Sequence, residues 1–174
     1  MRIFGFHFAT LDIRQDSRVH HQAFTQIVKD LQNTGDTTFP KNYEHLSEEE
    51  QIEILAVVKG SIDPKILTDT ISISTIESML ALKEIQLRNG ERGANRYIIS
   101  NNQTALNVME AFAMLNLCGF ENELPVDVIP LFETVEDLQN AEDVMRTLYT
   151  NRTYRYHLEK RKNNQTIMLG FSDG

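Results

Sequence analysis

Cysteine is almost absent from this sequence, since Cys118 is the only one among 174 residues. A single thiol cannot form an internal disulfide, and it also excludes the paired cysteines of zinc ribbons and thiol redox motifs. Five histidines are present, but none has the HxH or HExxH spacing of a zinc site. The sequence therefore indicates neither a disulfide-stabilised nor a zinc-dependent fold.

Basic residues are outnumbered, with 17 Lys and Arg against 25 Asp and Glu and a formal net charge of -8. Because nucleic acids bind basic surfaces, we expect no nucleic-acid partner. No apolar run is long enough to span a bilayer, and the amino terminus lacks the pattern of a signal peptide, so we expect no membrane association. The acidic balance fits a cytoplasmic enzyme.

Common nucleotide-binding and hydrolase motifs are also missing, because the sequence contains no GxGxxG, GxxxxGK[ST] or GxSxG. The composition that remains is typical of a globular protein, with 41% hydrophobic and 24% charged residues. A chain of this length can bury a sizeable core, and we expect residues 1–174 to form a single domain.

Strand and helix patterns alternate along the chain. An apolar stretch over residues 1–13 predicts a strand, and a helix with apolar residues at helical spacing follows to about residue 31. Ser47 and Glu50 form a capping box that starts a second helix, and a third is predicted over residues 69–89. Further strands are predicted at 96–100, 126–132 and 166–171, separated by helices at 104–117, 134–149 and 152–163.

This alternation indicates the α/β class, with four parallel strands in βαβ units. The pattern is compatible with a small doubly wound sheet and with half of a (β/α)8 barrel. The chain begins at a strand and ends three residues beyond another, with no helix to cover the last one. We therefore expect it to be a piece of something longer.

Polar side chains follow the predicted strands, where the working residues of parallel α/β sheets lie. Arg14 follows the first strand, Ser100 and two asparagines the second, Glu133 the third and Asp173 the last. A guanidinium matches phosphate or carboxylate, and two carboxylates from different strands are a usual protein share of a magnesium or manganese site. This edge predicts a small phosphorylated or carboxylated anion beside a divalent metal.

Each of these residues also has a structural explanation. Arg14 can be the ion-pair partner of Asp12 or Asp16. Glu133 precedes a helix cap, where a carboxylate favours the helix amino terminus, and Asp173 can be a solvated residue near the chain end. If Arg14 and Glu133 lay at opposite ends of the sheet, both the predicted fold and the predicted site would be wrong.

Several segments resemble motifs of the phosphoenolpyruvate carboxylases, and they occur in that family's order along essentially the whole chain. They are FG at 4–5 with LDIRQDS at 11–17 (LDIRQES in the family), YIIS at 97–100 (YVIS), PLFET at 130–134 followed by DL at 137–138, and MLGFSD at 168–173 (M-[IL]-GYSD).

The resemblance implies a lyase of carbon dioxide fixation that supplies the tricarboxylic acid cycle. Such a lyase is a (β/α)8 TIM-type barrel with extra helices. It joins bicarbonate to phosphoenolpyruvate, through carboxyphosphate and an enolate, and forms oxaloacetate and phosphate with Mg²⁺ or Mn²⁺. Matched residue by residue, the family implies that Glu133 and Asp173 are metal ligands and that Arg14 contacts the substrate phosphate. The resemblance also implies a homo-oligomer, because proteins of that family form homotetramers.

The sequence departs from the family in places. The family's Arg-His pair after the DIRQES serine is spread here over Arg18 and His20, so we assign neither a role. Phe171 replaces a tyrosine, and Gly174 stands where many members have serine. The lysine of the SDxxKD motif, the TAHPT histidine and the HGRGG loop are not in this chain. Two alternatives stay open, namely another metal-dependent barrel lyase or aldolase acting through an enolate, and a non-catalytic α/β ligand-binding module.

We expect the 174-residue chain to be inactive alone. The reaction needs the phosphate anchored, the enolate stabilised and the carboxylating species positioned together, and one arginine with two carboxylates supplies only part of this. A coupled assay for oxaloacetate, with Mn²⁺, phosphoenolpyruvate and bicarbonate, should detect no product. Metal-dependent oxaloacetate formation by this chain would contradict the expectation.

Overall fold

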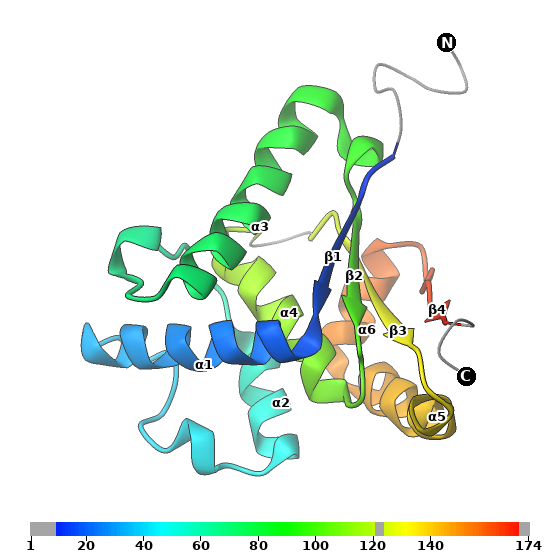
Figure 1. Ribbon diagram of the computed structural model, residues 1–174, viewed down its shortest axis with the longest axis horizontal. Coiled ribbons are helices and arrows are strands. Elements are labelled where there is room, and N and C mark those ends of the chain that lie inside the picture. Colours follow the sequence, from blue (N-terminus) through cyan, green and yellow to red (C-terminus); the bar gives the residue numbers. More distant parts are fainter. Residues whose placement is uncertain (1–9, 121–123, 171–174) are drawn as a thin grey trace.

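Four parallel strands form a single sheet in the computed structural model, which describes residues 10–120 and 124–170. The strands are β1 (Asp12–Asp16), β2 (Arg96–Ser100), β3 (Asp127–Phe132) and β4 (Met168–Leu169), and they lie side by side in sequence order (Figure 1). Arg14 is opposite Ile98, which is opposite Ile129. The predicted α/β fold with four parallel strands is confirmed.

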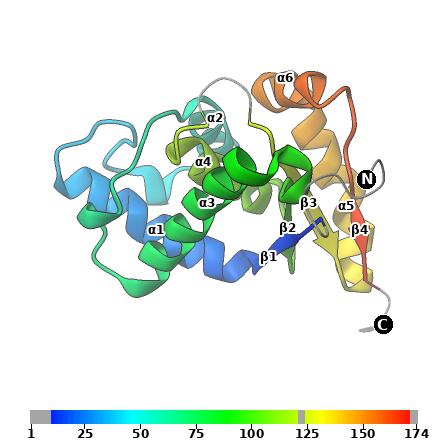
Figure 2. The same cartoon turned by 90° about the horizontal axis from the view of Figure 1, so that it is seen from above.

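Helices connect the strands. They are α1 (Ser17–Asn33), α2 (Glu48–Val57), α3 (Thr70–Asn89), α4 (Ala105–Leu117), α5 (Val135–Thr150) and α6 (Arg152–Lys160), with short 3-10 turns η1 (Tyr43–His45), η2 (Pro64–Ile66) and η3 (Glu91–Gly93). Three helices fill the connection from β1 to β2, whereas α4 alone joins β2 to β3 (Figure 2). Within the described residues, no helix is both long and apolar enough to cross a membrane.

The helices pack against one face of the sheet. The main hydrophobic core, which contains most of the buried helix side chains, takes strand side chains from that face: Tyr97, Ile99, Val128 and Phe132. The alternating residues Ile98, Ile129 and Leu131 form a separate small cluster, because the pleat sends successive side chains to opposite faces. Strands in sequence order with helices on one face match part of a barrel, since a doubly wound sheet is covered on both faces.

Helix α4 lies at the centre of the helical layer and contacts α1, α2, α3 and α5 as well as β2 and β3. Of its 13 residues, 11 are buried, which explains why its sequence is apolar nearly all round. Its buried Glu110 forms a hydrogen bond between Oε1 and Nδ1 of His21 on α1, at 2.7 Å. Burial raises the pKa of Glu110, and the bond to this carboxylate raises the pKa of His21.

Several element boundaries were predicted correctly. The capping box of Ser47 and Glu50 starts α2, and Gly90 ends α3 with a φ of 82°. Thr134 caps α5 through the backbone N–H of Asp137. The predicted end of α2 was wrong by two residues, because Val58 is already extended.

The predicted end of the first strand was also wrong. β1 spans Asp12–Asp16, so Arg14 lies within the strand instead of just after a strand ending at residue 13. Residues 1–9, which carried most of that prediction, lie outside the described part. Strand pairing uses backbone groups, so it does not require apolar side chains. The side chains of Asp12 and Arg14 are exposed, and these polar residues therefore destabilise the strand little.

Two histidines, His20 and His157, are buried, and burial disfavours their protonated form. Nε2 of His20 lies 2.8 Å from the hydroxyl oxygen of Tyr97, and burial lowers the pKa of His20 to about 4, against a smaller opposing effect of Asp16. Burial, together with the neighbouring Arg161, likewise lowers the pKa of His157 to about 4. The unfolded chain therefore binds protons near pH 6.5 that the folded chain does not.

We expect the free energy of unfolding to fall as the pH is lowered from 6.5 toward 4, by on the order of 3 kcal/mol for His20 alone. A His20→Gln variant has no titratable group at position 20, so its free energy of unfolding should fall correspondingly less over this range. His157 and Glu110 titrate alike in both proteins, so the difference between the two urea-denaturation series isolates His20. Parallel pH profiles for the variant and the unaltered chain would contradict this.

Candidate functional site

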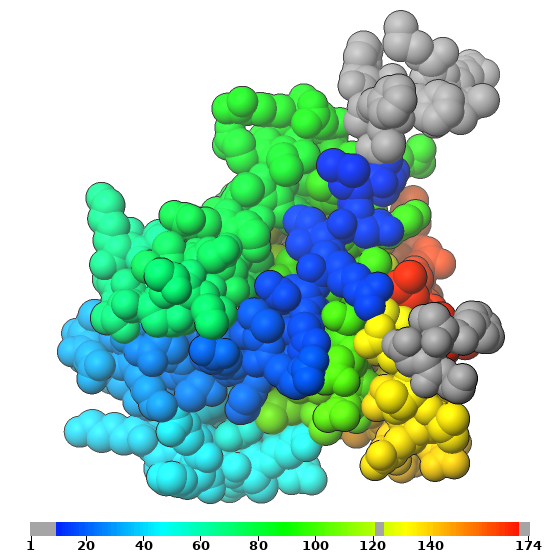
Figure 3. All heavy atoms as spheres, in the orientation of Figure 1, coloured from blue at the N-terminus to red at the C-terminus, as the bar shows by residue number. Residues whose placement is uncertain are grey.

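Arg14 and Glu133 meet at the carboxyl ends of the strands although they are 119 positions apart in sequence. Nη2 of Arg14 donates to Oε1 of Glu133 at 2.7 Å. Arg14 lies two residues before the end of β1, and Glu133 directly follows β3. Figure 3 shows the dark-blue segment that contains β1 beside green atoms and the yellow segment that follows β3, on one face. The structure thus brings these two residues to one edge, as the predicted site requires.

The second oxygen of Glu133 is held by the main chain. Oε2 accepts a hydrogen bond from the backbone N–H of Asn101 at 2.7 Å. Asn101 has a φ of 53°, a left-handed conformation in which asparagine is enriched several-fold over most other residues. The sequence showed Asn101 only as a polar residue after a strand, and its side-chain chemistry gave no indication of this contact.

Gly170, the residue directly after β4, lies against Glu133. Its backbone N–H donates to the carbonyl of Phe132 at 2.9 Å. A Cβ at this position would come within 3.2 Å of Glu133 Cα and 3.3 Å of Glu133 Cγ, so a side chain would require the Glu133 backbone to move. The absence of a side chain at Gly170 therefore helps to keep Glu133 in place.

The two arginine–aspartate pairings offered as alternatives for Arg14 are wrong. Asp12 pairs with Arg96 at 3.4 Å, and Asp16 pairs with Arg18 at 2.7 Å. The hydrogen bond from Arg18 lowers the pKa of Asp16. Arg14 turns instead to Glu133, because the parallel register places them at the same end of the sheet.

The structural alternative for Glu133 is weakened by the way α5 begins. Thr134 accepts a hydrogen bond from the N–H of Asp137, while Oδ2 of Asp137 accepts from the N–H groups of Glu133 and Thr134 at 3.2 and 3.0 Å. Thr134 and Asp137 therefore cap the helix without the Glu133 carboxylate, which is left for Arg14 and Asn101.

Asp173, the second predicted metal ligand, lies outside the described residues. Within 10–120 and 124–170, no three His, Cys, Asp or Glu side chains are grouped as a metal site. Glu133 itself suits a hard divalent cation, since each of its oxygens accepts one hydrogen bond and keeps a further lone pair. The roles of Glu133, Asp173 and Arg14 stay predictions.

Comparison with known proteins decides the family. The family model for phosphoenolpyruvate carboxylase matches residues 1–174. This chain belongs to the phosphoenolpyruvate carboxylase family. It is 35% identical to the phosphoenolpyruvate carboxylase of Nitrosomonas eutropha over 98% of this chain, and 32% identical to that of Gloeobacter violaceus over 99%. It covers 19% of the length of each, so it spans about a fifth of these relatives.

The family predicted from the LDIRQ and PLFET segments is thereby confirmed. A further relative, the phosphoenolpyruvate carboxylase of Xanthomonas euvesicatoria, is 29% identical over 99% of this chain and is covered over 18% of its length. The match over all 174 residues leaves no support for the alternative of a different barrel lyase or aldolase.

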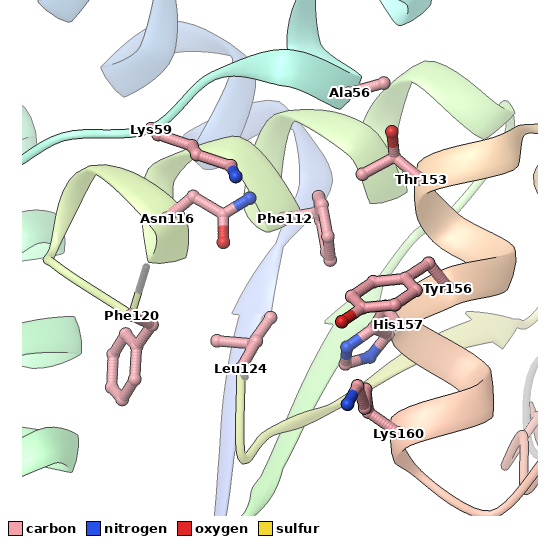
Figure 4. Close-up of a pocket in the computed structure, with 10 residues that line it drawn as sticks. All are labelled: Ala56, Lys59, Phe112, Asn116, Phe120, Leu124, Thr153, Tyr156, His157 and Lys160. Atoms are coloured by element: carbon pink, nitrogen blue, oxygen red, sulfur yellow. The ribbon is translucent and has the colours of Figure 1, made fainter. Parts of the chain in front are cut away.

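A separate cavity of about 330 Å³ lies away from the sheet edge where Arg14 and Glu133 meet. It is lined by Ala56, Lys59, Phe112, Asn116, Phe120, Leu124, Thr153, Tyr156, His157 and Lys160 (Figure 4). Leu124 and Lys160 lead into β3 and β4, so the cavity lies toward the starts of these strands. No carboxylate is among its described lining residues, and it therefore offers no ligand set for the family's divalent metal.

We expect Arg14→Ala to change the free energy of unfolding of the 174-residue chain by less than about 1 kcal/mol, because exposed ion pairs contribute little. The Arg14 side chain is 49% exposed and that of Glu133 is 21% exposed. Leu148→Ala, at a position that is 0% exposed, should cost about 2–5 kcal/mol and serves as the comparison. Urea denaturation measures both, and a loss above 2 kcal/mol for Arg14→Ala would assign Arg14 a structural role.

Proposed function

We propose that this chain supplies part of the active site of a phosphoenolpyruvate carboxylase that joins phosphoenolpyruvate and bicarbonate to give oxaloacetate and phosphate. In this proposal, Glu133 and Asp173 are ligands of Mg²⁺ or Mn²⁺, and Arg14 binds the phosphate group of the substrate. The observation that carries it is the direct contact of Arg14 with Glu133 at the carboxyl ends of the strands.

Arg14 is suited to link the substrate to the metal ligand. Its guanidinium has five N–H donors in a planar fork, and among the described residues only Nη2 is engaged, by Glu133. The Arg14 side chain is half-exposed, so a phosphate can reach its remaining donors and accept two parallel hydrogen bonds. Arg14 can therefore hold a substrate phosphate while it keeps its contact with the carboxylate.

Glu133 is suited to hold a cation at a defined place. One oxygen is fixed by Arg14 and the other by the N–H of Asn101, so the carboxylate plane has little freedom to rotate. A divalent metal, when bound, stabilises negative charge that develops on substrate oxygens. Glu133 and Asp173 would hold this cation, whose positive charge would offset the repulsion between the two carboxylates.

The rest of the active site is proposed to come from the parts of the carboxylase that this chain does not include, since its relatives are about five times as long. We also propose a cytoplasmic homo-oligomer. Among the described residues, β1 and β4 each pair with one neighbouring strand, and such edges are templates for further pairing, within a longer chain or between chains.

The test is a Glu133→Gln variant of the full-length carboxylase, numbered as here. Loss of a metal ligand should lower turnover more than about 100-fold while the protein stays folded. Arg14→Lys keeps the charge but loses the planar fork, and it should raise the KM for phosphoenolpyruvate about tenfold.

Glu136→Gln is the matched control, because it removes the same charge from an exposed residue three positions away. Steady-state kinetics at several Mn²⁺ concentrations, with circular dichroism for folding, compare the three variants. Near-normal turnover and an unchanged metal requirement for Glu133→Gln would remove Glu133 from the site.

A further inference from the structure

Asn101 aims a backbone N–H at the proposed metal ligand. The donor is the peptide nitrogen just after β2, and it lies 2.7 Å from Oε2 of Glu133. Asn101 has a left-handed conformation, with a φ of 53°, which turns the chain directly after this N–H. An extended residue here would continue the strand and carry the next peptide group away from its present partners.

The peptide group that follows Asn101 is clamped on both sides. Its carbonyl oxygen accepts a hydrogen bond from Oγ of Ser17 at 2.5 Å, and its N–H, on Asn102, donates to the carbonyl of Leu131 at 3.2 Å. Ser17 is the first residue of α1, and Leu131 belongs to β3. The left-handed turn is therefore held between two other elements of the fold.

The Ser17 hydroxyl is not needed to start its helix. Asp16 is the residue that caps α1, because its carboxylate accepts the N–H of Arg18 at 2.8 Å. Ser17 is 3% exposed, so it makes this bond away from competing water. Its hydroxyl is directed instead to a residue 84 positions away.

We propose that Ser17 is a positioning residue for Glu133, acting through the backbone of Asn101. The inference rests on the proposed function, in which Glu133 holds the metal. The segment from β1 into α1 then fixes both oxygens of Glu133. Arg14 holds Oε1 directly, and Ser17 holds Oε2 through the Asn101 turn. Groups that orient a metal ligand in this way typically change metal affinity when they are removed.

The first test is Ser17→Ala in the full-length carboxylase. We expect the dissociation constant for Mn²⁺, measured without substrate from the electron paramagnetic resonance signal of free Mn²⁺, to rise about tenfold. The Mn²⁺ concentration for half-maximal activity should rise with it, while turnover at saturating Mn²⁺ stays within about threefold. A metal-specific change of this kind separates positioning from a general loss of active protein, which would lower turnover at every metal concentration.

Ser72→Ala is the matched control. Ser72 is also a buried serine near a helix start. Its hydroxyl is within hydrogen-bonding distance of the Asp69 carboxylate, which caps the same helix, and of a backbone carbonyl of another helix, that of Ala23, at 3.1 Å. It makes no contact with Glu133 or Asn101 in the described structure. We expect Ser72→Ala to leave the Mn²⁺ requirement within about twofold of the unaltered enzyme.

A second pair of variants tests the turn itself. Asn101→Gly keeps the left-handed conformation without steric cost and should leave the Mn²⁺ requirement within about twofold. Asn101→Val places a β-branched residue where that conformation is a genuine outlier, and the requirement should rise about tenfold or more. If Ser17→Ala does not fold, this pair decides the matter.

The inference is overturned if Ser17→Ala keeps the Mn²⁺ requirement within twofold, if Ser72→Ala raises it equally, or if Asn101→Gly is as impaired as Asn101→Val. Failure of the proposed function looks different. In that case Glu133→Gln retains turnover and the normal Mn²⁺ requirement, whatever the Ser17 variant does.

Discussion

The parallel pairing of β1, β2 and β3 is the constraint on which the site depends. In parallel strands every carboxyl end lies at the same edge, so residues that follow different strands meet there whatever their distance in sequence. This pairing brings Arg14, Asn101 and Glu133 together from three separate segments. A slip of one residue in β1 would turn Arg14 to the opposite face of the sheet and break its contact with Glu133.

The one-sided helical layer determines which face is available for chemistry. The side chains of β2 and β3 that join the main core point toward α4 and its neighbours. Arg14 is in register with Ile98 and Ile129, which belong to the other face, so it projects away from the helices. In a closed barrel this other face is the interior, and the active sites of (β/α)8 barrel enzymes lie at the carboxyl-terminal rim.

Periodicity and capping predicted most of the elements, because these depend on local sequence. α4, α5 and β2 follow from apolar spacing and from residues such as Thr134. The end of β1 was misplaced because strand pairing uses backbone groups, which the polar side chains of residues 14–16 do not reveal. The Arg14–Glu133 contact was within reach of the strand-end argument, but the short-range alternative with Asp12 or Asp16 had equal standing until the register was known. The Asn101 contact was out of reach, since every residue except proline carries a backbone N–H.

The ion pair of Arg14 has a consequence for the entropy of substrate binding. A half-exposed arginine side chain without a partner samples many rotamers, and ordering it costs up to about 2 kcal/mol of side-chain entropy. Here the Glu133 carboxylate already restricts the guanidinium before any ligand arrives. The ordering cost is thus incurred when the protein folds, and an incoming anion meets a fork whose orientation is already selected.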